Sequence, residues 1–452
     1  MFSRVLVANR GEVAVRVIRA LHELGIEAVA VYSTADADAM HVRFADRAVC
    51  IGPPPASESY LKIPSVVAAA ETTGCEAVHP GWGFLAENAA FVSACEENDL
   101  VFIGPGADVM ARMGDKTHTK AEMRAAGVPL VPGTESSVSL EEAQRVGEEI
   151  GYPLLLKASA GGGGKGMRFV DASDDLVDAY SSAAAEAHAA FGDGSLYIEK
   201  MVRPARHVEI QVLADADGNV LTLGERECSI QRRHQKLIEE SPSVALDRET
   251  REEMEAAAER ACKAIGYRNA GTFEFLLGPD RSFYFIELNC RLQVEHPVSE
   301  LCTGIDLVRE QLRIAAGELL SQTGRAPRRG HAIEMRINAE DPARGFLPAP
   351  GRIERFRPPL GPFDRVDTCV EDGSVVPPYY DSLIAKLIVW DSDRPAAISR
   401  ALRALGELEV RGVPTTREAA IDVLRSEEFQ RGDYSTTFLE EAGRRLPALA
   451  GS

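Results

Sequence analysis

The chain has 452 residues, of which 45% are hydrophobic and 26% are charged, and its formal net charge at pH 7 is −19. The length predicts two to four domains, and the acidic balance argues against a nucleic-acid-binding surface. No apolar run is long enough for a membrane span, and a predicted strand begins within five residues of the start, so we expect neither a membrane segment nor a signal peptide. Eight cysteines without a CxxC pair indicate reduced thiols and a cytoplasmic protein.

The first 113 residues alternate between strand and helix patterns, which is typical of a doubly wound α/β domain. The predicted elements are strands at 4–8, 28–32, 77–79 and 101–103, with a helix that begins at Gly11 and is capped by Gly25. The loop at 79–88 follows a strand end, where such folds bind ligands, although an ordinary turn is equally compatible with it. A dinucleotide site is poorly supported, because residues 9–11 contain one glycine where the fingerprint needs three.

The second predicted domain, residues 114–203, carries a glycine run between two strands. Residues 152–157 are predicted as one strand and residues 167–170 as its hairpin partner, with four consecutive glycines at 161–164 between them. The backbone amides of such glycines can approach phosphate oxygens closely, and the run also permits movement. It is not a Walker A loop, and flexible linkers have similar composition. Its position at the tip of a hairpin predicts a lid.

The third predicted part, residues 204–446, contains a basic segment at 224–236 that is dense in Arg, His and Lys. In so acidic a chain this segment is a candidate anion site, and a solvated charge run is the alternative. Cys228 within it is expected to be a small buried thiol rather than a reactive one.

The stretch 283–297 holds the densest group of candidate functional side chains. Its first half is aromatic and branched, which predicts a strand, and five alternate residues after it would share one face of an extended chain: Glu287, Asn289, Arg291, Gln293 and Glu295. A half-buried edge strand is the simpler alternative, but this mixture suits metal, anion and proton-transfer roles together. If 271–277 pairs with it as a hairpin, Glu274 and Glu287 point to the same side and, with Asn289, suit Mg²⁺.

The order of eight motifs, from about Val5 to Leu439, resembles biotin carboxylase, the ATP-grasp component of acetyl-CoA and related acyl-CoA carboxylases. These motifs lie at 4–12, 113–116, 161–166, 199–200, 207–211, 231–236, 287–296 and 336–342. The resemblance implies an N-terminal doubly wound α/β domain, an ATP-grasp lid domain and a large C-terminal α+β domain. It also implies that ATP and bicarbonate form carboxyphosphate, which then carboxylates biotin.

The same resemblance implies a role for each matching residue at the nucleotide site. ATP phosphates would be held by Lys116 and Lys157 under a lid that includes Gly163, Gly164 and Met167. Adenine would contact Glu199, Lys200 and Val202, and the ribose and phosphates would lie near His207, Gln231 and His234. Mg²⁺ (or Mn²⁺) would be bound by Glu274, Glu287 and Asn289.

At the second substrate, the resemblance implies that bicarbonate sits against Arg291, Gln293 and the backbone of Val294, with Lys236 nearby. Glu295 would be the base that deprotonates bicarbonate. Arg336 would stabilise the biotin enolate.

The family pattern implies partners as well. Biotin would arrive on a separate biotin carboxyl carrier protein, because no Met-Lys-Met motif occurs in the sequence, and a carboxyltransferase subunit would select the acyl-CoA or keto-acid acceptor. Arg19 and Glu23 match positions at the family's homodimer interface. Two residues depart from the pattern: Trp82 replaces a tyrosine near biotin, and Thr416 replaces an asparagine.

Two other classes of function remain open. One is another ATP-grasp ligase that activates bicarbonate or a carboxylate. Carbamoyl-phosphate synthetase would need a duplicated, longer chain, and the purine-pathway carboxylating synthetase would lack the segment 336–342. The other is a non-catalytic nucleotide-binding regulatory subunit. That class predicts lost metal ligands or a lost base, whereas this chain retains Glu274, Glu287, Arg291, Glu295 and Arg336.

Overall fold

The computed structural model describes residues 1–134, 136–159, 167–233, 235–443 and 445–449. The N-terminal unit is a five-stranded parallel sheet in the order β3-β2-β1-β4-β5. Its strands are β1 (Arg4–Val7), β2 (Glu27–Ser33), β3 (Arg47–Gly52), β4 (Ala77–His79) and β5 (Val101–Phe102), and its helices are α1 (Gly11–Glu23), α2 (Met40–Phe44), α3 (Ile63–Thr73), α4 (Ala89–Glu97) and α5 (Ala107–Gly114). The predicted doubly wound domain is confirmed. The strand order reverses beside β1, so the loops after β1 and β4 lie where such sheets bind ligands.

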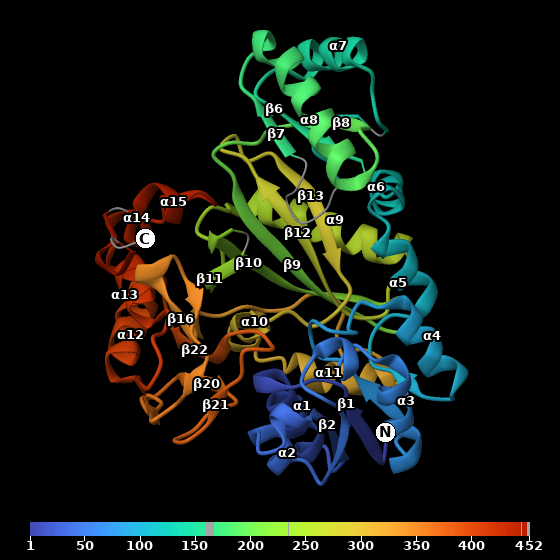
Figure 1. Cartoon of the computed structure of the whole chain (residues 1–452), viewed down its shortest axis with the longest axis vertical. Coiled ribbons are helices and arrows are strands. Elements are labelled where there is room, and N and C mark those ends of the chain that lie inside the picture. Colours follow the sequence, from blue (N-terminus) through green and yellow to red (C-terminus); the bar gives the residue numbers. More distant parts are fainter. Residues whose placement is uncertain (135, 160–166, 234, 444, 450–452) are drawn as a thin grey trace.

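A small antiparallel sheet of order β7-β6-β8 stands apart at the top of Figure 1. It consists of β6 (Leu154–Ala158), β7 (Met167–Val170) and β8 (Leu196–Lys200), with α7 (Leu140–Ile150) and α8 (Leu176–Phe191), and α6 (Lys116–Ala125) leads into it. The predicted hairpin of β6 and β7 is confirmed by their antiparallel register. The glycine run between them lies outside the described residues. Leu154, Leu156 and Ile198 form a separate apolar core here.

The centre of the molecule is a nine-stranded sheet whose main path runs β13-β12-β9-β10-β11-β15-β22-β20 (Figure 1). Its strands are β9 (Arg206–Ala214), β10 (Val220–Arg232), β11 (Gln235–Ser241), β12 (Asn269–Leu277), β13 (Phe283–Asn289), β14 (Gly324–Arg325), β15 (His331–Asn338), β20 (Asp364–Thr368) and β22 (Leu383–Asp391). The associated helices are α9 (Arg248–Ala264), α10 (His296–Thr303), α11 (Leu307–Ala315), α12 (Arg394–Glu407), α13 (Arg417–Arg425), α14 (Glu427–Arg431) and α15 (Phe438–Ala442). Short strands complete the C-terminal part: β16 (Glu340–Asp341), β17 (Leu347–Pro348), β18 (Gly351–Arg352), β19 (Arg355–Arg357), β21 (Val375–Val376) and β23 (Glu409–Arg411).

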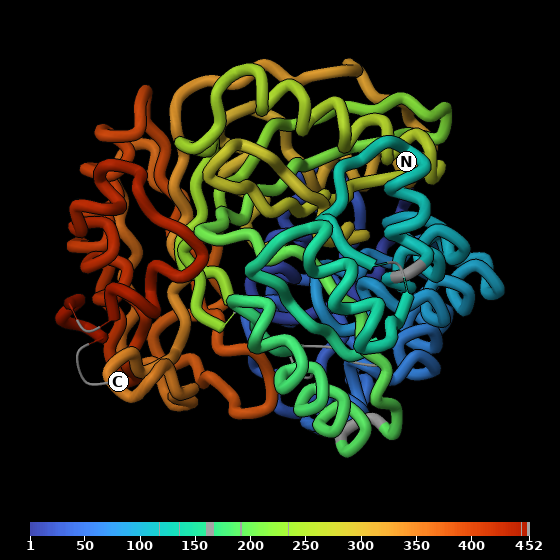
Figure 2. Tube along the Cα trace, turned by 90° about the horizontal axis from the view of Figure 1, so that it is seen from above, coloured from blue at the N-terminus to red at the C-terminus, as the bar shows by residue number. Residues whose placement is uncertain are grey.

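The N-terminal unit packs directly on the central sheet. Val13, Val17 and Leu21 of α1 are buried, and they share a core with Leu307 and Leu312 of α11. Helices α12 to α15 cover the opposite side of the molecule from α4 to α6, as Figures 1 and 2 both show. Within the described ranges, no helix is long and apolar enough to cross a membrane.

One predicted element ends early. The stretch from Glu287 to Glu295 was expected to stay extended, but β13 ends at Asn289 and α10 begins at His296. Pro297 explains the change, because a proline in the first helical turn needs no backbone donor and favours helix initiation. The residues between the two elements therefore form a loop rather than one wall of a strand.

Candidate active site

Three glutamates lie side by side across three strands of the large sheet. Glu209 on β9 is opposite Glu274 on β12, and Glu274 is opposite Glu287 on β13. Directly opposite residues point to the same face of a sheet, so the predicted common side of Glu274 and Glu287 is confirmed. Like charges in such a row repel each other, and the row is therefore suited to a cation.

Lys236 on β11 brings one positive charge to this row. Its Nζ donates to Glu209 Oε2 at 2.7 Å, to Glu274 Oε1 at 3.1 Å and to Glu295 Oε1 at 2.5 Å. Burial alone would lower the pKa of Lys236, but Cys228 and the three carboxylates outweigh it and hold the pKa well above its usual value. A single ammonium group thus joins the glutamate row to Glu295.

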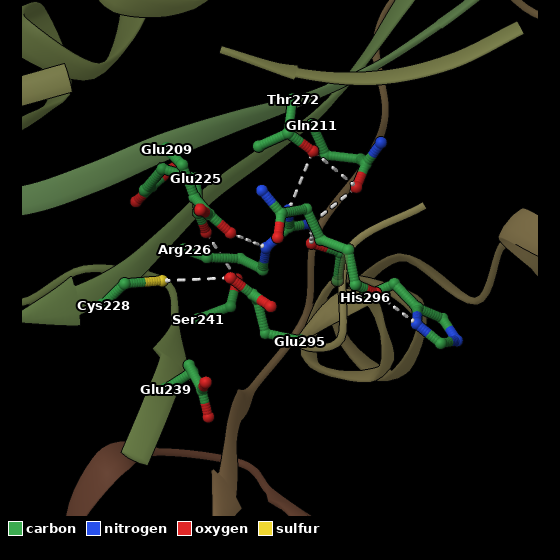
Figure 3. Close-up of polar contacts among 12 residues, drawn as sticks. Glu209, Gln211, Glu225, Arg226, Cys228, Glu239, Ser241, Thr272, Glu295 and His296 are labelled. Carbon is green, nitrogen blue, oxygen red and sulfur yellow. Dashed lines mark hydrogen bonds and ion pairs between the residues drawn. The ribbon is translucent and has the colours of Figure 1, made fainter. Parts of the chain in front are cut away.

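Glu295 is a fully buried carboxylate between two cations. Its Oε2 accepts from Arg336 Nη2 at 3.0 Å. Figure 3 shows its other contact, in which Cys228 Sγ lies 3.9 Å from Oε1. Burial would raise the pKa of Glu295, but Lys236, Arg336 and Arg226 together hold it well below the usual range. The side chain is therefore ionised.

The basic side chains of β10 do not all lie on one face of the sheet. Arg226 is fully buried, and its guanidinium donates to Glu209 Oε1 at 2.5 Å, to Gln211 Oε1 at 2.7 Å and to Thr272 Oγ1 at 3.1 Å (Figure 3). Alternate residues of a strand point to opposite faces, so a basic run on β10 cannot present all of its charges together. The solvated alternative is wrong for Arg226, and Cys228 is buried as predicted.

The loop after β13 brings Arg291 and Gln293 to the same place despite its irregular course. Arg291 Nη2 donates to Asn289 Oδ1 at 2.9 Å and its Nη1 lies 3.4 Å from Gln293 Oε1, while Gln293 Nε2 donates to Glu274 Oε1 at 3.0 Å. Arg291 Nε also donates to Glu87 Oε2 at 2.8 Å. Glu87 belongs to the loop at 79–88, so that loop is part of the site rather than a plain turn.

The carboxylates of this site fit a divalent cation. Glu274 and Glu287 offer two carboxylates on adjacent strands, and Mg²⁺ prefers such oxygen ligands. Ligand atoms of His207, Glu209 and Glu274 also lie within 4.8 Å of one another. Asn289 lies beside them, although its Nδ2 donates to Glu274 Oε1 at 2.9 Å and its Oδ1 accepts from Arg291.

The residues predicted for the nucleotide lie at the junction of the lid sheet and the central sheet. Lys157 of β6 and Lys120 of α6 both form ion pairs with Glu199 of β8. Burial would raise the pKa of Glu199, but these two lysines lower it. Lys200 Nζ donates to the carbonyl oxygens of residues 151 and 152 at 2.9 and 2.8 Å. Its ammonium group therefore binds the backbone just before β6.

Other predicted nucleotide residues are spread around this junction. Lys116 is exposed at the start of α6, Met167 begins β7, and Val202 is half-buried between β8 and β9. Gln231 lies opposite Lys236 in the β10–β11 register, and His207 Nε2 is 3.0 Å from Glu274 Oε2. Gly163, Gly164 and His234 lie outside the described residues.

Besides Glu295, two residues fix Arg336 on β15: Glu239 binds its side chain, and Thr416 binds its backbone. Arg336 Nε donates to Glu239 Oε1 at 2.5 Å. The Thr416 hydroxyl donates to the Arg336 carbonyl oxygen at 2.7 Å and accepts from the Asn338 backbone N–H at 2.9 Å. The threonine that departs from the family pattern thus supports the strand that carries Arg336.

Trp82, Glu23 and Arg19 have contacts beyond the site. Trp82 Nε1 donates to Glu12 Oε1 at 3.1 Å, which ties its loop to α1. Glu23 Oε2 lies 3.5 Å from Arg309 Nη1, and the Arg19 guanidinium lies 5.9 Å from the Phe44 ring centroid.

Several residues of the site were not assigned a role from sequence. Glu209 shares a strand face with His207 by simple alternation in 206–212, and that pattern was a usable signal. Glu239 gave no local signal. Arg226 and Glu87 lay within segments that the sequence singled out, but their individual partners lie on other strands and loops far away in the sequence.

Comparison with known proteins agrees with this arrangement along nearly the whole chain. Family models match residues 1–110 (biotin carboxylase, N-terminal domain), 115–323 (carbamoyl-phosphate synthase L chain, ATP binding domain) and 334–441 (biotin carboxylase C-terminal domain). The middle model describes an ATP-binding domain named after another enzyme, and the two flanking models carry the biotin carboxylase name.

Individual relatives are similar over their full length. The chain is 52% identical over 445 residues to the biotin carboxylase of Nostoc sp., covering 98% of this chain and 100% of the relative. It is 51% identical over 443 residues to biotin carboxylase 1 of Bacillus subtilis, covering 97% and 98%. A solved structure of the biotin carboxylase domain dimer of Hydrogenobacter thermophilus 2-oxoglutarate carboxylase, in complex with MgADP, ADP and bicarbonate, has a TM-score of 0.90 and 49% identity, covering 98% of each chain.

Proposed function

The chain belongs to the biotin carboxylase family, and we propose that it carboxylates biotin on a carrier protein, using ATP and bicarbonate through carboxyphosphate. One observation carries the proposal: the Glu295 carboxylate lies between Lys236 and Arg336 and accepts a hydrogen bond from each. Lys236 and Gln293 both donate to the Glu274 carboxylate. The Arg291 guanidinium, a donor suited to an anion, lies 3.4 Å from Gln293 Oε1. A base, an anion fork and a stabilising cation are thus in one site.

Bicarbonate is a poor nucleophile, so it needs a base and fixed orientation. Arg291, Gln293 and the backbone of Val294 would hold it, with Lys236 alongside. An anion that engages Lys236 would weaken the ion pair between Lys236 and Glu295. The pKa of Glu295 would then rise, and the carboxylate would become a stronger base toward the bicarbonate proton.

ATP would bind beneath the lid sheet. Lys116 and Lys157 would contact its phosphates, the β8 end at Glu199, Lys200 and Val202 would contact adenine, and His207, Gln231 and His234 would lie near the ribose and phosphates. Gly163, Gly164 and Met167 would close over the nucleotide and exclude water from carboxyphosphate. Glu274 and Glu287, with Asn289 beside them, would hold Mg²⁺, which balances phosphate charge in phosphoryl transfer.

In the first chemical step, a bicarbonate oxygen attacks the γ-phosphorus of ATP, the bond to ADP breaks, and carboxyphosphate forms. Carboxyphosphate then releases CO₂ and phosphate beside biotin. The biotin ureido nitrogen gives its proton to the released phosphate and attacks CO₂, while Arg336 stabilises the negative charge on the ureido oxygen. The products are ADP, phosphate and carboxybiotin.

The partners that this reaction needs are a biotin carboxyl carrier protein and a carboxyltransferase. The acceptor is set by the carboxyltransferase. We propose a cytoplasmic location, since all eight cysteines are free thiols, and a homodimer, since the Hydrogenobacter relative is described as a dimer.

Residues 1–113, 114–203 and 204–446 remain our proposed domain divisions, and the continuous path of the large sheet from β9 to β20 supports the third.

The experiment is ATP hydrolysis by the purified chain with and without bicarbonate and free biotin. We expect hydrolysis that depends on bicarbonate and rises when biotin is added. A regulatory subunit would bind ATP without hydrolysing it, and a carbamoyl-phosphate-forming enzyme would respond to ammonia rather than biotin. Either result would overturn the proposed function.

A further inference from the structure

Side chains from the neighbouring strands β15 and β22 bind two consecutive residues, Val294 and Glu295, of the loop before α10. Arg336 on β15 is directly opposite Lys386 on β22, so their side chains leave the same face of the sheet. Arg336 binds the Glu295 carboxylate, and Lys386 Nζ donates to the Val294 carbonyl oxygen at 2.8 Å. The Lys386 contact fixes the peptide that joins Val294 to Glu295.

Lys386 is fully buried, and its charge is balanced from two elements. Glu12 Oε2 of α1 lies 3.2 Å from Lys386 Nζ, and Asp367 Oδ2 of β20 lies 3.7 Å away. Asp367 already accepts two hydrogen bonds from Arg365, at 2.9 and 2.8 Å. Glu12 is therefore the partner that faces Lys386 most closely, and its other oxygen is held by Trp82 Nε1.

A buried lysine is an unfavourable choice for a position that needs only to be filled. Removing an ammonium group from water costs several kcal/mol, and an apolar residue of similar size commonly serves stability as well or better. What an apolar residue cannot do is donate to the Val294 carbonyl. This distinguishes the contact from ordinary packing.

We propose that Lys386, Glu12 and Trp82 form a positioning unit for the bicarbonate step, an inference that rests on the function proposed above. The unit holds the Val294–Glu295 peptide so that the backbone proposed to bind bicarbonate and the Glu295 carboxylate keep a fixed separation. Through Trp82 it reaches the loop at 79–88, and it therefore joins the N-terminal domain to the loop that carries the base. None of the three is assigned direct contact with bicarbonate.

The test is bicarbonate-dependent ATP hydrolysis without biotin, so that any effect of Trp82 on biotin binding does not enter. For Lys386→Met we expect kcat/KM for bicarbonate to fall about 10- to 100-fold, because displacement of a catalytic group by about 1 Å has an effect of that size. The KM for ATP should stay nearly unchanged, since the proposed nucleotide contacts are elsewhere. Lys62→Met, at an exposed lysine, is the matched control and should behave like the wild type.

The double variant Glu12→Gln/Lys386→Met removes both charges of the pair, so neither is left buried without the other. If Lys386 only neutralises Glu12, the double variant should recover wild-type kcat/KM for bicarbonate. If it positions the loop, the loss should persist in the double variant. Trp82→Phe, which removes one donor and keeps an aromatic ring, should show a smaller loss in the same constant.

Recovery in the double variant, or an equal loss in the constants for ATP and bicarbonate, would overturn the positioning role. The proposed function fails differently: the wild-type chain would then show no bicarbonate-dependent hydrolysis at all. An active wild type with an unaffected Lys386→Met variant would refute the positioning unit alone.

Discussion

Glu239 and Glu240 are consecutive residues of β11, both fully buried, and they point to opposite faces of the central sheet. Glu240 faces the C-terminal helices and accepts hydrogen bonds from His331 Nε2 at 2.7 Å, from Arg394 Nε at 2.7 Å and from the Tyr434 hydroxyl. Burial alone would raise the pKa of Glu240, but His331 and Arg394 lower it to about 2. This face gives one carboxylate its own set of partners.

Glu239 faces the proposed active site, and Arg336, the cation that binds it, also binds Glu295. Burial, together with the negative charge of Glu295, outweighs Arg336 and raises the pKa of Glu239 to about 7. The comparison teaches that Glu240 has cations of its own, whereas Glu239 and Glu295 share Arg336. Shared cations can be redistributed when an anion or a metal ion binds.

The largest expected effect is on the active-site face. Glu295→Gln should keep ATP binding and lower biotin-dependent turnover by roughly 10²–10⁴, the usual range for loss of general-base assistance. Steady-state kinetics and equilibrium ATP binding measure the two quantities. Turnover within a few-fold of the wild type would remove Glu295 from the role of base.

The structural face should respond in stability instead. Glu240→Gln should destabilise the fold by about 3–5 kcal/mol, because one partner of a buried, satisfied ion pair is removed, while kcat per folded molecule is unchanged. Denaturant unfolding is the measurement, with the exposed Glu427→Gln as the control.

The stability difference between the wild type and Glu240→Gln also tests the pKa of Glu240 when it is measured at several pH values. Its folded pKa of about 2 lies below the unfolded value of about 4.3, so the stabilisation is complete above about pH 4.3 and is lost as pH falls toward 2. The difference between wild type and Glu240→Gln should shrink over that interval. A constant difference would contradict the assigned charge state.

Glu239→Gln should give the opposite slope. The folded pKa of about 7 exceeds the unfolded value of about 4.3, so ionisation opposes folding and wild-type stability decreases as pH rises between these values. The variant should match the wild type near pH 4 and exceed it by on the order of 1–3 kcal/mol above pH 7. If the stability differences from the wild type changed with pH in the same direction for Glu239→Gln and Glu240→Gln, the assigned difference between the two carboxylates would be wrong.

The smallest effect is expected where β15 is held in place. Thr416→Val removes a buried hydroxyl that both donates and accepts, and it should cost about 1–2 kcal/mol. Thr416→Ser keeps the hydroxyl and should stay closer to the wild type. Equal midpoints of thermal unfolding for the two variants would show that the hydroxyl does not support the strand.

Local patterns predicted much of this molecule. Apolar runs and glycine ends gave the N-terminal strands, and the hairpin of β12 and β13 placed Glu274 opposite Glu287. The end of β13 was missed because alternation appeared to continue to Glu295, although Pro297 marked a helix start. Lys386 was missed for a different reason: in an apolar strand a lone lysine gives no hint of its partner, and its contacts come from α1, β20 and the loop before α10.

The central claim is that the site around Glu295 makes carboxybiotin from ATP and bicarbonate. The most direct measurement supplies radiolabelled bicarbonate, ATP, Mg²⁺ and biotin to the purified chain and recovers label on biotin together with ADP. The account predicts labelled carboxybiotin that requires ATP and is lost in Glu295→Gln. ATP hydrolysis without any label on biotin, or labelling that persists in Glu295→Gln, would contradict it.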